Sequence, residues 1–354
     1  MKAKKIAIVA EWLTSRGGAE YVVDSLLEAF PEADLFTTVF NEKKLPEYIK
    51  RNPKTSFLQS VPFSRSKHQS IPPLLLPAIK SLNLEGYDLI ISSSSAIGKG
   101  INKPENSVHV CYCHTPMRYA WQSEIDDRLV SKPFGRFFLE YLKRWDIRNN
   151  KDVDFFLTNS KTVQKRIKKF YGRSSTVIYP PVNLLQSKQS KPGNYFISLG
   201  RLIPYKRTDL AILSCQKLGQ KLLVAGDGED LSSLEKIATK PTKFLGRISS
   251  EQKAQYLGSA KALIFPGEED FGIVPIEALS CGTPVIAYAK GGASEYIINR
   301  KNGILFKEQN VESLIEAIEK FSKTKFDKKY IIKSAQKFAK ECFKKEIKEF
   351  IERI

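Results

Sequence analysis

The sequence has few of the residues that define disulfide-rich, zinc-binding or membrane-spanning proteins. Five of its 354 residues are cysteine, and this odd, scattered set fits a reducing cytoplasm better than a disulfide framework. Three are histidine, and no cysteine–histidine cluster has the spacing of a zinc site. No apolar run approaches the roughly 18 residues that a membrane helix needs. The short apolar run at the N-terminus breaks at Glu11 without a cleavage site, so we interpret it as a buried strand and not as a signal peptide.

What the sequence does have is enough apolar material for two packed cores and a large excess of positive charge. Hydrophobic residues make up 42% of the chain, and the length suggests two domains. The net charge of +19 is compatible with nucleic acid, an anionic membrane or an anionic substrate. The sequence has no zinc finger and no interleaved basic and aromatic recognition module, so nucleic-acid binding is the least favoured of the three.

Short apolar runs alternate with amphipathic stretches along the chain, which predicts an α/β fold with parallel sheets. Helices are predicted over 19–30 and 160–172, from near Lys206, Asp230, Ser249 and Val274, and over the lysine-rich tail 327–354. Strands are predicted over 5–10, 35–40, 87–93, 108–113, 154–159 and 175–182, and then over 194–200, 220–226, 242–246, 260–267 and 283–288.

A polar stretch containing proline and glycine, 182–193, separates the two series of strands and is the predicted linker. The predicted domains are therefore an N-terminal Rossmann-like domain over 1–185 and a second one over 186–335. Residues 336–354 are predicted as a C-terminal helix that could pack back on the first domain. Two halves of similar size with a cleft between them result.

The segment 265–288 carries the strongest functional signal in the second half. It contains Glu269 and Glu277, with Phe271 and Gly272 in a turn and a helix starting near Val274. Backbone amides at a helix N-terminus can bind an anionic or hydroxylated group, and two carboxylates can accept hydrogen bonds from vicinal sugar hydroxyls. Alone, this spacing of two glutamates most often indicates a solvated helix face.

Other candidate residues stand where a predicted strand ends and a helix begins. Arg201 and Lys206 follow the first strand of the second half, where a guanidinium and an ammonium could neutralise a diphosphate leaving group. Gly17 and Gly18 follow the first strand of the chain, and His114 follows the strand 108–113. Each has a plainer alternative: solvated surface charges, an ordinary glycine turn and a structural histidine.

In their order along the chain these segments resemble the retaining GT-B glycosyltransferases of family 4. Among them, the sequence is most similar to the GDP-mannose-dependent mannosyltransferases of O-antigen and exopolysaccharide assembly. The motifs that carry the resemblance are GGAEYVV (17–23), IISSSSAIGKG, HTPMRYAW (114–121), GRLIPYKRTDLAI (200–212), VAGDGED, FLGRIS and PGEEDFGI.

The resemblance implies a role for each matching residue. His114, Arg201, Lys206 and Glu269 would act at the reacting centre, with His114 and Glu269 on the sugar and the two cations on the phosphates. Glu277 would hold the ribose hydroxyls. The remaining predicted donor-binding residues are Gly17, Gly18, Arg207, Gly246, Arg247, Ile248, Asp270, Phe271, Gly272, Ile273 and Val274.

The resemblance also implies a nucleotide-sugar donor, a lipid-linked or saccharide acceptor, a front-face mechanism with retention, and neither metal nor cofactor. Asp152 and Asp154 have the spacing of a metal-binding Asp-x-Asp motif, but they open a predicted strand and we reject them as ligands. Two alternatives of the same fold stay open: a transferase that uses a UDP-sugar, such as UDP-glucose or UDP-N-acetylglucosamine, and a nucleotide-sugar epimerase.

Two segments of the first half are candidates for contact with an anionic membrane. Residues 50–82 mix basic residues with apolar ones, and prolines at 72, 73 and 77 exclude a regular long helix there. The segment is either a solvated loop with a few packed residues or a surface that meets anionic lipid, and we favour the second interpretation. Residues 133–148 carry Phe134, Phe138, Tyr141 and Trp145 at helical spacing, which more often indicates core packing. The predicted location is cytoplasmic and peripheral at the inner face of the plasma membrane.

Overall fold

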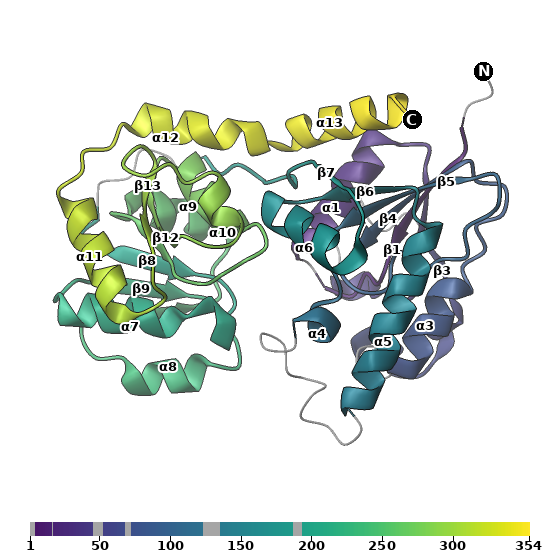
Figure 1. Ribbon diagram of the computed structural model, residues 1–354. Coiled ribbons are helices and arrows are strands. Elements are labelled where there is room, and N and C mark those ends of the chain that lie inside the picture. Colours follow the sequence, from purple (N-terminus) through teal and green to yellow (C-terminus); the bar gives the residue numbers. More distant parts are fainter. Residues whose placement is uncertain (1–3, 16, 45–51, 68–71, 123–134, 187–192) are drawn as a thin grey trace. The chain divides into compact units, whose positions relative to one another are not determined.

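The computed structural model describes residues 4–15, 17–44, 52–67, 72–122, 135–186 and 193–354. The chain divides into two compact units, of which unit 1 comprises residues 1–181 and 340–354 and unit 2 comprises residues 182–339. Each unit is built on a parallel sheet with helices packed against it, which confirms the predicted α/β class with two Rossmann-like halves (Figure 1). Because residues 340–354 belong to unit 1, the chain returns to its first unit at its end.

Unit 1 has a seven-stranded parallel sheet with the order β3-β2-β1-β4-β5-β6-β7. The direction in which strands are added reverses between β1 and β4, whose register pairs Ile8 with Ile91. At such a reversal the carboxyl ends of the neighbouring strands border a crevice, which is where open α/β sheets bind ligands. The strands are β1 Ile6–Ala10, β2 Asp34–Thr37, β3 Lys54–Thr55, β4 Leu89–Ser94, β5 Val108–Cys113, β6 Phe155–Thr158 and β7 Thr176–Val177.

Alternating strand residues bury both faces of this sheet. Ile6 and Ile8 pack with α1 and α13 on one face, whereas Ala7 and Val9 pack with α3 and α5 on the other. The C-terminal helix α13 is held to α1 by its buried Phe343 and by ion pairs of its lysines with acidic residues of α1. The helices of unit 1 are α1 Gly18–Ala29, α2 Ser64–Lys67, α3 Pro72–Lys80, α4 Arg118–Trp121, α5 Gly135–Asn149, α6 Lys161–Tyr171 and α13 Lys340–Glu352.

Two helices of unit 1 show how the local sequence decides the backbone. In α6 the Ser160 hydroxyl accepts from the Val163 amide and Gly172 ends the helix in the left-handed region, as predicted. The prolines at 72, 73 and 77 exclude only a long helix, since residues 72–80 form α3, a nine-residue helix with Pro72 and Pro73 in its first turn and Pro77 inside it. Prolines are tolerated in the first turn, where the missing amide has no helical partner, and the buried Ile79 shows that the helix is held by core packing.

Unit 2 has a six-stranded parallel sheet with the order β10-β9-β8-β11-β12-β13. Its strand order reverses between β8 and β11, so the loops that follow these two strands border the expected crevice. The strands are β8 Phe196–Leu199, β9 Leu222–Ala225, β10 Thr242–Gly246, β11 Leu263–Phe265, β12 Val285–Tyr288 and β13 Gly303–Phe306.

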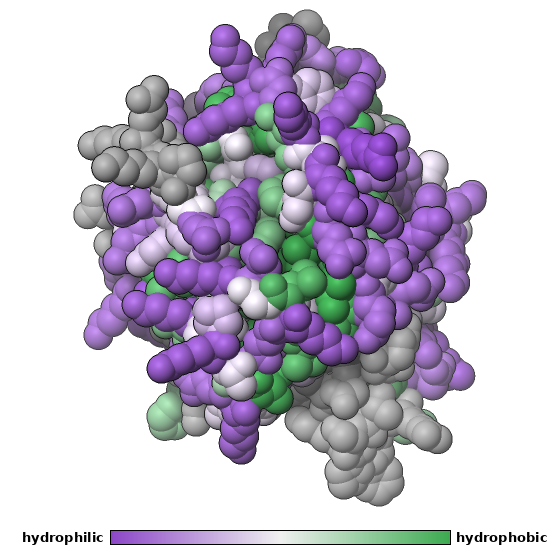
Figure 2. Space-filling view, turned by 90° about the vertical axis from the view of Figure 1, so that its left-hand side faces the viewer, coloured by the Kyte–Doolittle hydropathy of each residue, from purple (hydrophilic) through white to green (hydrophobic). Residues whose placement is uncertain are grey.

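Helices pack against this sheet and bury its apolar side chains. The core cluster that includes Phe196, Val224 and Ile264 takes in residues of α7, α8 and α11, while α10 packs against α9 and α12. The side of unit 2 seen in Figure 2 is mostly hydrophilic around a narrow hydrophobic strip. The helices are α7 Thr208–Lys217, α8 Leu231–Ile237, α9 Ser250–Ser259, α10 Ile273–Ser280, α11 Val311–Ser322 and α12 Lys328–Ala335.

Candidate functional site

The loops after β8 and β11 meet at the strand-order reversal of unit 2 and bring two predicted residues together. Lys206 Nζ forms an ion pair with Glu269 Oε1, and both side chains are more than four-fifths buried. Gly267 makes the contact possible, because a Cβ atom there would lie 2.9 Å from the Lys206 Cα. A cation and a carboxylate that are joined across this edge can contact the charged and the hydroxylated parts of one ligand.

The turn from Glu269 to Gly272 leads directly into α10. Gly272 has φ +84°, a conformation that glycine adopts without strain, and it is the N-cap of the helix. Tyr296 Oη lies 2.8 Å from the Phe271 carbonyl oxygen and 2.7 Å from that of Gly272, and so fixes the turn. Ile273 and Val274 form the first turn of α10, whose free amides carry partial positive charge.

Glu277 lies in the second turn of α10 and is 6% exposed. Its Oε1 pairs with the Nζ of Lys253 on α9, whereas its Oε2 is buried without a hydrogen-bond partner among the residues that the structure describes. Burial raises the pKa of Glu277, and the nearby Lys253 opposes that effect. A buried acceptor without a donor is costly, so Oε2 is suited to accept a hydrogen bond from a ligand hydroxyl.

The two arginines predicted beside Lys206 are in different states. Arg201 is exposed and makes no hydrogen bond or ion pair with the described part of the chain, so its guanidinium is available to a ligand. Arg207 has φ +53° and its Nη2 lies 3.0 Å from Asp209 Oδ2, with Nη1 3.5 Å from the Gln309 carbonyl oxygen. Its charge is therefore already partnered at the start of α7.

Gly246 is the last residue of β10, two strands away from β8, and Arg247 and Ile248 follow it. The Gly246 carbonyl accepts from the Gly226 amide at 2.8 Å, and Arg247 Nε lies 3.1 Å from Asp227 Oδ2. Arg247 is 85% exposed in its side chain. These residues thus join the β9 and β10 loops and lie apart from the Lys206–Glu269 pair, while Asp270 lies between that pair and α10 in the chain.

The carboxyl edge of unit 1 carries His114 and the start of α1. His114 Nε2 lies 2.8 Å from Ser93 Oγ at the end of β4, and the Asn159 amide donates to the His114 carbonyl at 3.0 Å. Gly17 is the N-cap of α1 and Gly18 its first residue, and the Gly17 amide donates to the buried Glu20 carboxylate. These contacts hold the backbone in place at His114, where β5 ends, and at Gly17, where α1 begins.

Glu11 lies directly after β1. From the sequence alone we recognised it only as the residue that ends an apolar run. Its Oε1 accepts from the Ser94 hydroxyl at 3.0 Å and from the amides of Ser95, Ala96 and Gly98. Burial raises the pKa of Glu11, and these four donors partly offset the effect. The signal in the sequence was a single carboxylate at a buried strand end, but its partners lie more than 80 residues away.

A second buried charge anchors the loop that follows His114. Lys99 pairs with Asp146 of α5, and both side chains are almost fully buried. The other carboxylate oxygen of Asp146 accepts from Trp121 Nε1 at 2.7 Å and from the Tyr171 hydroxyl at 2.8 Å. Helix α5 therefore holds Trp121, the last residue of the HTPMRYAW segment, in place through Asp146.

Some features lie outside the predicted site. Asp154 binds Lys103 Nζ at 2.6 Å and accepts from the His109 amide, which accounts for one acid of the Asp-x-Asp spacing. Among the residues that the structure describes, no group of three or more acidic, histidine or cysteine side chains could hold a metal ion. A cavity of about 370 Å³ lies between β13 and α11, and none of the predicted site residues lines it.

Comparison with known proteins bears on the function of these two edges. The family described as glycosyl transferases group 1 matches residues 184–338, and glycosyltransferase family 4 matches residues 16–185. The chain is a glycosyltransferase of the GT-B fold. The predicted enzyme class and the resemblance to family 4 are thereby confirmed, whereas the donor sugar, the acceptor and the individual site residues stay predictions.

Two curated relatives of this glycosyltransferase are named as mannosyltransferases, and another is uncharacterized. An uncharacterized glycosyltransferase, MJ1178 of Methanocaldococcus jannaschii, is 24% identical and aligns with 85% of this chain and 84% of its own length. The α-1,3/1,6-mannosyltransferase ALG2 of Kluyveromyces lactis is 28% identical over 62% of this chain and 54% of its own. The O-antigen chain mannosyltransferase RfbU of Salmonella typhimurium is 28% identical over 55% and 60%.

A solved structure agrees with the fold. HepE of Anabaena in complex with UDP matches 99% of this glycosyltransferase and all of its own chain with a TM-score of 0.72, at 18% identity. At this identity the likeness shows the shared fold.

Proposed function

We propose that this glycosyltransferase moves a hexose with retention from a nucleotide sugar to a hydroxyl of a lipid-linked or polysaccharide acceptor in cell-surface glycan assembly. Our first candidate for the donor is GDP-mannose. The observation that carries the proposal is the arrangement at the reversal of the unit 2 sheet. There Lys206 pairs with Glu269, which lies in the turn before α10, and the buried Oε2 of Glu277 has no hydrogen-bond donor among the described residues.

The proposed donor site divides the nucleotide sugar among these groups. Lys206, Arg201 and the first amides of α10 would bind the diphosphate, whose negative charge grows as the sugar leaves. Glu269 would accept from sugar hydroxyls and Glu277 from the ribose hydroxyls. His114 would contact the primary hydroxyl of the sugar, as the resemblance implies.

In the proposed reaction the bond between the sugar and the diphosphate breaks as the acceptor oxygen bonds to the same face of the sugar. The leaving phosphate oxygen takes the proton of the acceptor hydroxyl. Because positive side chains and helix amides would neutralise the departing charge, we propose that the enzyme needs neither metal nor cofactor. Chelation with EDTA should therefore leave turnover unchanged, and recovery of lost turnover by Mg²⁺ or Mn²⁺ would contradict this part of the proposal.

The choice of mannose rests on the names of two relatives, ALG2 and RfbU. A UDP-sugar is the second candidate, because a structure of the same fold binds UDP. Thermal unfolding should be followed with GDP-mannose, UDP-glucose and UDP-N-acetylglucosamine, and with each nucleoside diphosphate. The proposal predicts the largest stabilisation with GDP-mannose, and a larger one with a UDP-sugar would replace it as donor.

An epimerase of the same fold makes a different product. Incubation with labelled donor and no acceptor should yield no epimerised nucleotide sugar, and its appearance would reject transfer as the main reaction. We further propose that the enzyme works in the cytoplasm at the inner face of the plasma membrane. All five cysteines are free thiols, which suits a reducing compartment. No helix in the described part of the chain has the length and apolar character to span a bilayer.

A further inference from the structure

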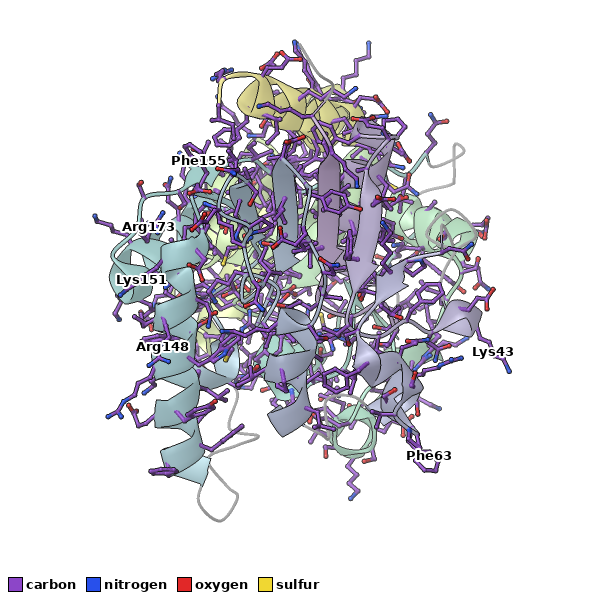
Figure 3. All side chains as sticks on the ribbon, turned by 90° about the vertical axis from the view of Figure 1, so that its right-hand side faces the viewer. Lys43, Phe63, Arg148, Lys151, Phe155 and Arg173 are labelled. Carbon is purple, nitrogen blue, oxygen red and sulfur yellow. The ribbon has the colours of Figure 1, made fainter. Side chains whose placement is uncertain are left out.

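Helix α5 has an outward face that combines exposed aromatic and basic side chains. Phe137 is 80% exposed and Tyr141 52%, although aromatic side chains of this size normally find a core. Arg144 and Arg148 continue the same stripe at intervals of three or four residues, Lys151 follows just after the end of α5, and all three are exposed. We refer to these five residues as the α5 stripe. Figure 3 shows Arg148 and Lys151 projecting outward from this side of unit 1.

The opposite face of α5 accounts for the folding role of the helix. Phe138 and Trp145 pack with the buried Leu142 against the core that includes Ile90, and Asp146 forms the buried pair with Lys99. The aromatic spacing in residues 133–148 therefore predicted core packing correctly for Phe138 and Trp145 but not for Tyr141. Phe134 lies outside the described residues. Within the α5 stripe, the Tyr141 ring stacks on that of Phe138, with ring centroids 6.2 Å apart, and so makes one contact with the core-facing side of the helix.

The charge of the α5 stripe selects its partner. Its three basic residues form no ion pair with the described residues, and the neighbouring Glu140 pairs with Lys143 at 2.8 Å while it also attracts Arg144. A second copy of this chain would bring like charges together and is disfavoured. Aromatic rings that sit beside unpaired basic groups match the interface of an anionic bilayer, where rings enter the headgroup layer and cations contact lipid phosphates.

Unit 1 has a second strongly exposed aromatic side chain, which lies at the opposite edge of the view in Figure 3 from Arg148. Phe63 is 79% exposed and has φ +63°, a conformation that bulky residues rarely adopt. Figure 3 labels it in the view that also shows Arg148. Phe63 is part of the segment 50–82 for which we predicted membrane contact, and Phe57 in the same segment is 46% exposed. The described part of that segment therefore contributes two exposed phenylalanine rings, while α5 supplies a continuous stripe.

We propose that the α5 stripe docks unit 1 onto an anionic lipid surface. The inference deepens the proposed function, because it names the surface at which the enzyme would meet a lipid-linked acceptor. It rests on the proposed function only for the biological role of docking, since vesicle binding itself needs neither donor nor acceptor. Because α5 also holds the loop after His114 through Asp146 and Trp121, docking and the His114 loop depend on one rigid helix.

The test is co-sedimentation of the full chain with vesicles of phosphatidylglycerol and phosphatidylcholine in equal parts, and with phosphatidylcholine alone, without donor or acceptor. Wild type should bind the anionic vesicles and not the neutral ones. The double variant Arg144→Glu/Arg148→Glu should bind at least about tenfold more weakly, as each basic residue near an anionic surface contributes severalfold in affinity. Phe137→Ala should also weaken binding about tenfold, because burial of a phenyl ring is lost.

The matched control is Lys165→Glu/Lys168→Glu in α6, which makes the same change in net charge on an exposed basic face of the same unit. It should bind vesicles within about threefold of wild type, since the aromatic and basic stripe is intact. An equal loss in the control would overturn the proposal in favour of overall charge. So would an Arg144→Glu/Arg148→Glu variant that binds like wild type.

A nucleic acid is the other polyanion that a basic surface could meet. If duplex DNA displaced the protein from vesicles and Phe137→Ala left vesicle binding unchanged, the surface would be a polyanion surface and the lipid proposal would be rejected. Nucleoside diphosphate affinity, measured by calorimetry, should be unchanged in Arg144→Glu/Arg148→Glu. Loss of vesicle binding with intact nucleotide binding separates this inference from the proposed function.

Discussion

Unit 1 and unit 2 are built on the same kind of parallel sheet, but the charged groups at their carboxyl edges are used differently. In unit 1, Glu11 accepts four hydrogen bonds through one oxygen, and Asp146 binds Lys99, Trp121 and Tyr171. In unit 2, Glu277 has one buried oxygen without a partner, and Arg201 is exposed. The two buried carboxylates of unit 1 are saturated by the protein itself, whereas Glu277 and Arg201 of unit 2 have binding capacity left for a ligand.

This difference indicates what a sheet edge needs for each task. Saturated buried charges fix loops in one conformation, because removing a partner would leave a costly unpaired group. Partly saturated charges at a helix N-terminus can exchange a side-chain or solvent contact for a ligand contact. We therefore expect substitutions of Glu11 or Asp146 in unit 1 to act on stability, and substitutions of the Lys206, Glu269 and Glu277 group in unit 2 to act on turnover and donor affinity.

The largest effect is expected for Lys206→Ala. Removal of the ammonium takes away charge stabilisation of the leaving diphosphate, and turnover should fall by about 10²–10³-fold. Lys217→Ala is the matched control, because this exposed lysine pairs with Glu312 at the far end of α7. Lys217→Ala should turn over like wild type. Steady-state rates of the two variants and of wild type measure the difference. Turnover in Lys206→Ala close to that of wild type would remove Lys206 from the reaction.

The next effect concerns a buried histidine of unit 1. His109 lies inside β5 with Nε2 2.8 Å from Ser92 Oγ, and burial lowers its pKa from 6.5 to about 4. Between these two pKa values the unfolded chain binds a proton at His109 and the folded chain does not. The contribution of His109 to the free energy of unfolding is therefore complete above pH 6.5 and is lost as the pH falls toward 4. Between pH 7 and pH 5 this should lower the free energy of unfolding by about 2 kcal/mol.

The measurement for His109 is urea unfolding across this pH range in wild type and in His109→Asn. The variant cannot titrate there, so its stability should fall less by about the same 2 kcal/mol. Other groups contribute equally to both proteins and cancel in the difference. Parallel curves for the two proteins would show that His109 is not held neutral by burial.

A smaller effect is expected for the Glu277–Lys253 pair of unit 2. Glu277→Gln keeps the shape but removes the negative charge that accepts ribose hydroxyls, so the KM for the donor should rise about tenfold with little change in kcat. Lys253→Met should act in the same direction by leaving the carboxylate without its counter-charge. Because both act on one interaction, the double variant should lose less than the product of the single losses. Fully multiplicative losses in this double-mutant cycle would show that Lys253 does not act through Glu277.

The smallest effect is expected for Arg247→Ala. The guanidinium is 85% exposed and pairs at the surface with Asp227, which contributes about 0–1 kcal/mol to stability. If the Gly246–Ile248 segment lines the nucleotide base through its backbone, donor KM should change by less than about twofold. A loss of tenfold or more would show that the Arg247 side chain binds the donor directly.

Local signals in the sequence predicted most of the fold. Strand β1 and helix α10 lie within one or two residues of their predicted positions, and Ser249 caps α9 with a capping box to Gln252. The predicted strand over 175–182 is reduced to Thr176–Val177. The prolines at 180 and 181 have no backbone N–H to donate, so the strand cannot continue its hydrogen bonding to β6.

Contacts between distant parts of the chain could not be predicted from the sequence. Glu11 and Ser94 are 83 residues apart, and Lys253 and Glu277 are 24 apart on different helices. No spacing rule links such residues, because sheet order and helix packing decide which of them meet. The same holds for Tyr296, whose hydroxyl fixes the turn before α10 from a separate loop. Motif resemblance identified Lys206 and Glu269, but only the fold shows that they are paired.

The central claim is that the carboxyl edge of the unit 2 sheet binds the diphosphate of a nucleotide sugar through Lys206. Titration calorimetry of GDP, GMP, UDP and UMP with wild type and Lys206→Ala tests it most directly. The account predicts that wild type binds the preferred diphosphate at least about tenfold more tightly than its monophosphate, and that Lys206→Ala loses most of this difference. Equal affinities for diphosphate and monophosphate in wild type, or an unchanged difference in the variant, would contradict it.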